Sequence, residues 1–328
     1  MADTIALVGG ESLLGRELRD AIGESRLAFS LRLIAAPDEE EGKLTDAAGE
    51  LAVIAKLNRD SFDEASAIVL ACSPETAREV FQFGVSGTLV DLSYGLEELP
   101  EARLRAPVAE PHDFRVPHDA VQVIAHPAAI ALALLLGRIH PVFPIARTVV
   151  QVFEPASERG RAGIDEMQEQ SVALLSFKPL PKAVYDAQVS YSLLPRFGEN
   201  APVALEEVER RIERHLATLL ANGSGAPVPS LRLIQAPVFH GYSFSLWVEF
   251  ADRPSIAALE QLLDEAPIDF RGAAAEPPNN IGAAGQVGVI AGAVAEDRNN
   301  PRALWLWMTA DNLKLSSDNA FQVVQEVL

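Results

Sequence analysis

Short apolar runs alternate with helix-like patterns through the first 127 residues. The run at residues 4–8 ends in Gly9-Gly10, and an amphipathic pattern follows from Leu13 to Ile22. Strand, glycine turn, helix and second strand form a βαβ unit, which implies parallel strands and a right-handed crossover. Further apolar runs predict strands at residues 30–36, 51–57, 67–71, 88–91 and 121–125, and a helix from about residue 74. This part of the chain therefore predicts a doubly wound α/β domain with a parallel sheet.

The pattern changes after residue 127. The clearest helix spans residues 204–220, where apolar side chains recur every three or four positions with charged residues between them. Two more helices are expected at residues 163–175 and 254–263. Ser316 or Ser317 can cap a last helix that runs to the C-terminus.

Strands in the second half follow a different rhythm from those in the first. They are expected at residues 147–153, 231–238, 243–250, 287–294 and 303–309, the second and third of them adjacent. The proline-rich segments 100–117 and 177–200 predict irregular loops. The second half therefore predicts an α+β domain around a mostly antiparallel sheet.

Composition indicates a globular protein with room for two cores. The chain has 328 residues, of which 48% are hydrophobic and 22% charged. The formal net charge of -19 argues against nucleic acid or an anionic membrane as a partner. Cys72 is the one cysteine, and the first residues lack the basic segment of a signal peptide, so we expect a cytoplasmic protein. No spacing of metal ligands stands out, and no metal site is expected.

The segment from Gly9 to Gly15 (GGESLLG) has the context of a dinucleotide-binding turn, after a strand and at the start of a helix. Gly9 allows the tight turn and Gly15 the close approach of helix and strand. Ser12, Leu13 and Leu14 would present backbone N–H groups to a pyrophosphate. Ser12 adds a side chain where phosphate approaches, and Glu11 adds negative charge, so a structural turn without a ligand is an equal alternative.

The end of the second strand, at Ala36, is where a dinucleotide-binding domain selects its cofactor. A carboxylate there accepts the ribose 2′-hydroxyl of NAD, whereas an arginine accepts the 2′-phosphate of NADP. The residues that follow are Asp38-Glu39-Glu40-Glu41, which would repel a 2′-phosphate. They favour NAD over NADP if a dinucleotide binds at all, and a solvated acidic loop is the competing interpretation.

Six stretches in the order of the chain resemble the aspartate-semialdehyde dehydrogenase family, and more specifically its Usg-like paralogues. The stretches are VGGESLLGREL (8–18), VDLS (90–93), IAHP (124–127), SERGRAGIDE (157–166), APVFHGYSFSLWVEF (236–250) and LWMTADNLKLSSDNA (306–320). The resemblance covers nearly the whole chain.

The resemblance implies a fold, an assembly and a reaction. It implies a Rossmann-like NAD(P)-binding domain of residues 1–127 with 311–328, and a catalytic and dimerisation domain of residues 128–310. It also implies a homodimer. Active members of the family reduce aspartyl phosphate to the semialdehyde with NADPH, through a thioester on a cysteine. Ser73 and Pro74, by the same resemblance, lie nearest the nucleotide.

The catalytic groups of the family are replaced at the matching positions of this chain. The nucleophilic cysteine matches Ala129, which cannot form a thioester. The acid–base histidine matches Tyr242, a poor base at neutral pH. The arginine that binds the substrate carboxylate matches Gln235, and the glutamine that positions the substrate matches Glu154. The phosphate-binding arginine matches Glu97, so its charge is reversed.

Other residues are candidates to take over. His126 and His240 could join Glu154 and Tyr242 in an acid–base or metal group, or form an ordinary polar pair. Cys72 is a candidate nucleophile, although a small buried side chain is the simpler interpretation. Arg159 and Arg161 could attract an anion, with a solvated face as the alternative. His215 is expected on the polar side of its helix.

Three hypotheses follow. The first is a catalytically defective, homodimeric member of the family that binds a dinucleotide weakly or not at all. The second is an NAD(P)-dependent oxidoreductase for another aldehyde or keto substrate, with Tyr242 or His240 as the donor to the developing alkoxide. The third is a regulatory partner that pairs with an active dehydrogenase subunit.

Overall fold

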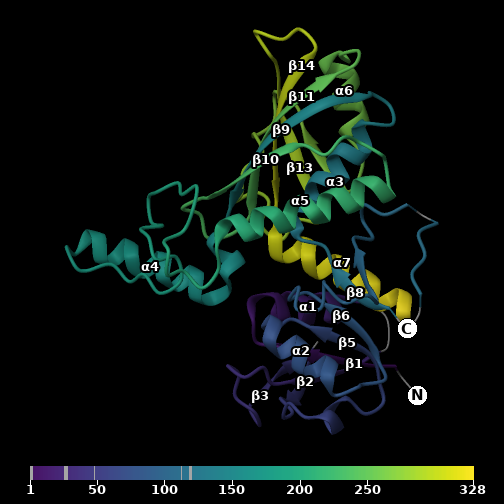
Figure 1. Ribbon diagram of the computed structural model, residues 1–328, viewed down its shortest axis with the longest axis vertical. Coiled ribbons are helices and arrows are strands. Elements are labelled where there is room, and N and C mark those ends of the chain that lie inside the picture. The colour runs from purple at the N-terminus through teal and green to yellow at the C-terminus, as the bar shows by residue number, and fades with distance from the viewer. Residues whose placement is uncertain (1–2, 26–28, 48, 112, 118–119) are drawn as a thin grey trace. The chain divides into compact units, whose positions relative to one another are not determined.

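The computed structural model describes residues 3–25, 29–47, 49–111, 113–117 and 120–328 (Figure 1). It divides into two compact units, of which the first comprises Met1–Ala125 with Ser316–Leu328 and the second His126–Leu315. No helix in the described part of the chain is long and apolar enough to cross a membrane.

The first unit is built on a parallel six-stranded sheet in the order β2-β1-β5-β6-β8-β7. Four residues of β1 in succession are buried, because a parallel strand with neighbours on both sides is covered on both faces. This sheet confirms the predicted doubly wound domain. The strands are β1 (Asp3–Val8), β2 (Phe29–Ile34), β5 (Ala65–Leu70), β6 (Thr88–Asp91), β7 (Ala102–Arg105) and β8 (Val121–Ile124).

The structure corrects two sequence predictions for the first unit. The strand expected at residues 51–57 is shorter: β4 (Glu50–Val53) pairs with β3 (Leu44–Ala47) in a separate antiparallel hairpin, and after it Ala55 forms one parallel bridge with Ile34 of β2. The large apolar residues of this hairpin, Leu44, Leu51 and Val53, face solvent, and Leu51 is 83% exposed. The loop expected at residues 100–117 contains β7, which pairs with β8 at the edge of the sheet. The helices of this unit are α1 (Leu13–Glu24) and α2 (Pro74–Gln82), with the 3₁₀ turn η1 (Arg59–Phe62).

The second unit contains a mixed six-stranded sheet in the order β10-β9-β11-β14-β13-β12. The three central pairings are antiparallel, which confirms the predicted mostly antiparallel sheet. The strands expected at 231–238 and 243–250 are not adjacent, because β9 lies between them and pairs in parallel with β10. The strands are β9 (Ile145–Glu154), β10 (Ser230–Gln235), β11 (Tyr242–Phe250), β12 (Ile268–Arg271), β13 (Val289–Glu296) and β14 (Ala303–Ala310).

Helices pack on this sheet and extend from it (Figure 1). Helix α3 is apolar on every side, and α5 and α6 cover it, so it is buried along most of its length. The helices are α3 (Pro127–Ile139), α4 (Gly160–Leu175), α5 (Leu205–Asn222), α6 (Ile256–Leu263) and α7 (Asn312–Val327), with η2 (Ala156–Arg159) before α4.

The last helix begins earlier than the sequence suggests. Asp311 accepts the backbone N–H groups of Leu313 and Lys314 at 2.9 and 3.1 Å, as a capping residue does. Ser316 and Ser317 therefore lie inside α7 and do not cap it.

Candidate functional site

The glycine turn of the first unit has the backbone geometry that a dinucleotide-binding turn needs. Gly9 has φ of +83°, and a side chain there would collide with the carbonyl oxygen of Ala71. A side chain at Gly15 would collide with the carbonyl oxygen of Gly9, so glycine is required for α1 to approach β1. Leu13 and Leu14 open α1, and their N–H groups have no acceptor inside the helix.

Ser12 turns its hydroxyl inward and caps α1. Its Oγ accepts the Gly15 N–H at 2.9 Å and lies 2.8 Å from the carbonyl oxygen of Gly9 and 3.1 Å from that of Ala71. The side chain thus binds the turn's own backbone. One N–H group that could meet a phosphate is already used.

One residue of the acidic loop enters the turn. Glu39 accepts the Glu11 N–H at 2.7 Å with one carboxylate oxygen and the Ala36 N–H at 3.1 Å with the other. Burial raises the pKa of Glu39. Asp38, Glu40 and Glu41 are exposed. The four carboxylates therefore do not act alike, and Glu39 alone of them links the glycine turn to the end of β2.

Cys72 and Ser73 follow β5. Burial, together with the charge of Asp91, raises the pKa of the Cys72 thiol to about 12, so the thiolate that a nucleophile needs is scarce at neutral pH. Ser73 caps α2 by accepting the Thr76 N–H at 3.3 Å, and Pro74 occupies the first turn. Glu97 lies half-buried in the turn after β6.

In the second unit, the start of α3 holds no nucleophile. His126 caps the helix, since its Nδ1 accepts the Ala128 N–H at 3.3 Å. Ala129 is fully buried in the first turn. The backbone N–H of His126 donates to Nδ1 of His215 at 3.0 Å, and His215 is buried, so its expected place on a polar helix face is wrong.

Glu154, at the end of β9, is the centre of a buried group of charges. It is fully buried, and Arg159 Nη2 lies 2.7 Å from its Oε1. The Tyr242 hydroxyl donates to Oε2 at 3.4 Å. Although burial opposes the charge, the Glu154 carboxylate raises the pKa of Arg159. The side chain of Arg159 is 13% exposed, so the interpretation of a solvated arginine is wrong, whereas Arg161 is 72% exposed and pairs with Asp165.

Glu158 lies beside this pair and contacts α3 and α7. Asn312 Nδ2 donates to Oε1 at 2.8 Å, and His126 Nε2 lies 3.7 Å from Oε2. Burial, followed by the charge of Glu154, raises the pKa of Glu158 to about 7. Burial also lowers the pKa of His126, which keeps the imidazole neutral. We refer to His126, Glu154, Glu158, Arg159, Tyr242 and Asn312 as the charged cluster.

Of the remaining predicted residues, Gln235 lies against the charged cluster, whereas His240 lies in solvent. Gln235 is fully buried, and its Nε2 donates to the backbone oxygens of Glu154 and Ala236, both at 3.0 Å. His240 is exposed, and its carbonyl oxygen accepts from Asn280. The fold thus brings His126, Glu154, Tyr242 and Gln235 together but leaves the imidazole of His240 in solvent.

Sequence reasoning missed Glu158 and Asn312 and misjudged Arg159. The closeness in sequence of Glu154, at the end of a strand, and Arg159 was an available signal, since unlike charges this close in sequence can pair. Asn312 is more than 150 residues away, and only the fold brings it to Glu158. In the described part of the chain, no three His, Cys, Asp or Glu side chains are arranged to hold a metal ion.

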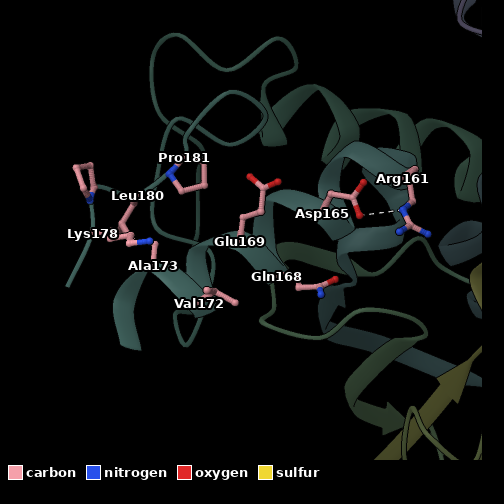
Figure 2. A pocket seen from close by; sticks show the side chains of 10 residues that line it. Arg161, Asp165, Gln168, Glu169, Val172, Ala173, Lys178, Leu180 and Pro181 are labelled. Carbon is pink, nitrogen blue, oxygen red and sulfur yellow. Dashed lines mark hydrogen bonds and ion pairs between the residues drawn. The ribbon is translucent and has the colours of Figure 1, made fainter. Parts of the chain in front are cut away.

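A groove lies along α4 and the segment that follows it (Figure 2). Its volume is about 730 Å³, and its lining is mostly apolar. Val172 lines it and is 58% exposed, and the nearby Leu175 and Phe177 are 76% and 97% exposed. Large exposed apolar side chains gathered at the end of one helix and just after it indicate a surface for association.

We predict that Arg159→Met destabilises the protein by about 3–5 kcal/mol, because it leaves the Glu154 carboxylate buried without its cation. The double variant Glu154→Gln, Arg159→Met should recover at least half of this loss. Arg161→Met is the matched control, and its exposed pair predicts a change below about 0.5 kcal/mol. Equilibrium urea unfolding measures all three, and an Arg159→Met protein as stable as the control would contradict the pairing.

Known proteins support the fold and the family. The model of the semialdehyde dehydrogenase dimerisation domain matches residues 136–315. The chain is 23% identical to an aspartate-semialdehyde dehydrogenase of Rickettsia bellii, over 99% of this chain and 97% of the relative. It is 27% identical to a USG-1 protein homolog of Azotobacter vinelandii, over 98% and 96%. A solved structure of a probable aspartate-semialdehyde dehydrogenase from Pseudomonas aeruginosa superposes with a TM-score of 0.87 at 24% identity, covering 100% of this chain and 98% of that one. The chain therefore belongs to the semialdehyde dehydrogenase family.

Proposed function

We propose that this protein is a homodimeric member of the family that has lost the aspartate-semialdehyde dehydrogenase reaction. The observation that carries the proposal is Ala129, a buried methyl group at the position that matches the family's nucleophile. No thioester forms without a thiolate. Cys72 does not replace it, because its raised pKa leaves it protonated.

The residues that match the other catalytic positions are engaged with one another. Tyr242 donates to Glu154, Gln235 donates to the Glu154 backbone, and Arg159 neutralises the Glu154 carboxylate. A buried charge that already has its partner gains little by exchanging it for a substrate group. The charged cluster therefore supports a structural role for positions that are catalytic in active relatives.

The first unit supports a dinucleotide site that favours NAD and binds it weakly. Gly9 and Gly15 keep the backbone geometry, and Glu39 stands where a carboxylate accepts ribose hydroxyls. Binding is weakened because Ser12 takes the Gly15 N–H and Glu39 takes the Glu11 N–H.

Glu158 favours a second candidate function, the reduction of another aldehyde or ketone by direct hydride transfer. A carboxyl group with a pKa of about 7 suits proton donation at neutral pH, and His126 lies 3.7 Å from it. This candidate uses Glu158 in place of the earlier choice of Tyr242 or His240, since the first is bonded to Glu154 and the second faces solvent.

We predict no turnover of aspartate semialdehyde with phosphate and NADP or NAD by the purified protein. Ala129→Cys alone should also be inactive, because the matching base and both anion clamps remain replaced. Spectrophotometric detection of NAD(P)H at 340 nm measures this, and an Ala129→Ser variant controls for the added bulk. Turnover by the wild type at the rate of an active dehydrogenase would refute the proposal. Turnover of other aldehydes or ketones in the same assay would support the second candidate.

The homodimer is proposed from the family's dimerisation domain and from the exposed apolar residues at the end of α4 and just after it. We predict that Leu175→Asp with Phe177→Asp shifts the protein from dimer to monomer, because two charges would be buried in an apolar contact. Sedimentation velocity measures the change, and Leu51→Asp, an exposed leucine of the first unit, is the control. A double variant that stays dimeric would place the interface elsewhere, and a monomeric wild type would favour pairing with a different subunit.

A further inference from the structure

Three cations and a hydroxyl converge on one carboxylate beside the glycine turn. Lys43 Nζ lies 2.8 Å and Arg16 Nη2 3.5 Å from Oε2 of Glu11. Arg19 Nη1 lies 2.5 Å from Oε1, to which the Thr45 hydroxyl also donates at 3.0 Å. Contrary to the sequence interpretation, Glu11 does not present an unpaired negative charge to a phosphate.

The cations would keep much of their arrangement without Glu11. Arg19 is buried, and its guanidinium also donates to the backbone oxygens of Gly10 and Asp46 and to Thr45 Oγ1. Those bonds fix the guanidinium independently of the carboxylate. Lys43 and Arg16 are 45% and 60% exposed in their side chains, so an anion from solvent can reach them.

The Glu11 carboxylate is held firmly in its ionised form. The hydrogen bond from Lys43, acting against burial and together with the bond from Arg19, lowers the pKa of Glu11 to about 2. The other carboxylates nearby are those of Asp38 and Glu39. Burial raises the pKa of Glu39, and the charges of Asp38 and Glu11 add to this effect. Three cations thus face Glu11: Arg16 and Arg19 from α1, and Lys43 from the residue before β3. Two further carboxylates, Asp38 and Glu39, lie in the loop after β2.

A phosphate monoester has the chemistry to replace Glu11 in this arrangement. It carries two negative charges near neutral pH and offers three terminal oxygens to arginine and lysine donors. The adjacent turn is the part of the fold that meets the phosphates of a nucleotide. The Glu39 carboxylate already accepts the Glu11 N–H. Carboxylates of the chain itself therefore occupy both places where an anion could bind at the turn: beside the three cations, and at this N–H group.

We propose that Arg16, Arg19 and Lys43 form an anion site for a nucleotide phosphate monoester, and that Glu11 occupies this site from within and excludes 2′-phosphorylated dinucleotides. The inference rests on the proposed dinucleotide site and deepens it. It assigns the discrimination between NAD and NADP to Glu11 of the glycine turn, whereas the sequence had suggested the acidic loop.

Calorimetric titration of the full-length protein with NAD and NADP tests this, because the two ligands differ by the 2′-phosphate alone. Glu11→Gln should bind NADP at least tenfold more tightly than the wild type, while its affinity for NAD changes less than threefold. Glu41→Gln removes the same charge from an exposed position of the acidic loop and should leave both affinities within threefold of the wild type. Adding Lys43→Ala to Glu11→Gln should abolish the gain.

The inference is overturned if Glu11→Gln binds NADP within threefold of the wild-type affinity, or if Glu41→Gln shows an equal gain. Thermal unfolding checks that Glu11→Gln is folded, and Glu11→Ser provides the same test if it is not. A wild type that binds neither dinucleotide contradicts the proposed NAD site, yet a gain for NADP in Glu11→Gln would still support the anion site. A wild type that binds NAD, with no gain in the variant, overturns the anion site alone.

Discussion

A fully buried carboxylate needs a cation beside it. In the second unit, the arrangement of the charged cluster depends on the ion pair between Glu154 and Arg159. Glu154 ends β9, and the short turn η2 returns the chain so that Arg159 reaches it at 2.7 Å. The same turn places Glu158 against Asn312 and His126. Without the arginine, two carboxylates would lie buried side by side, at a cost of several kcal/mol. The pairing therefore fixes the side chains of the charged cluster at the end of β9.

In both units, carboxylates are paired with cations of the same chain. In the first, carboxylates of the chain accept a backbone N–H group of the glycine turn and pair with the cations beside it. In the second, the buried side chains of Glu154, Arg159 and Tyr242 pair with one another through a salt bridge and a hydrogen bond. The result is a family fold in which carboxylates of both units are paired with cations of the same chain.

Much of the fold could be predicted from the sequence, because local periodicity and the glycine turn carry it. The hairpin of β3 and β4 escaped prediction, since an exposed apolar residue such as Leu51 looks like a core residue in sequence. The charged cluster escaped for another reason. His126, Glu158 and Asn312 come from three separate parts of the chain, and no local spacing reports that they meet. The family resemblance pointed to Glu154 and Tyr242 but gave no reason to place Arg159 against Glu154.

The ionisation of Glu158 tests the central claim most directly, because it reports whether this site is a buried charge cluster or an open polar pocket. Infrared difference spectra of the wild type minus Glu158→Gln, recorded across a pH series, isolate the carboxyl band of this residue. The cluster predicts a midpoint near pH 7, since burial and the Glu154 charge oppose ionisation. A midpoint near 4.5, the ordinary value for a glutamate, would mean that water reaches the group and that the cluster does not fill the site.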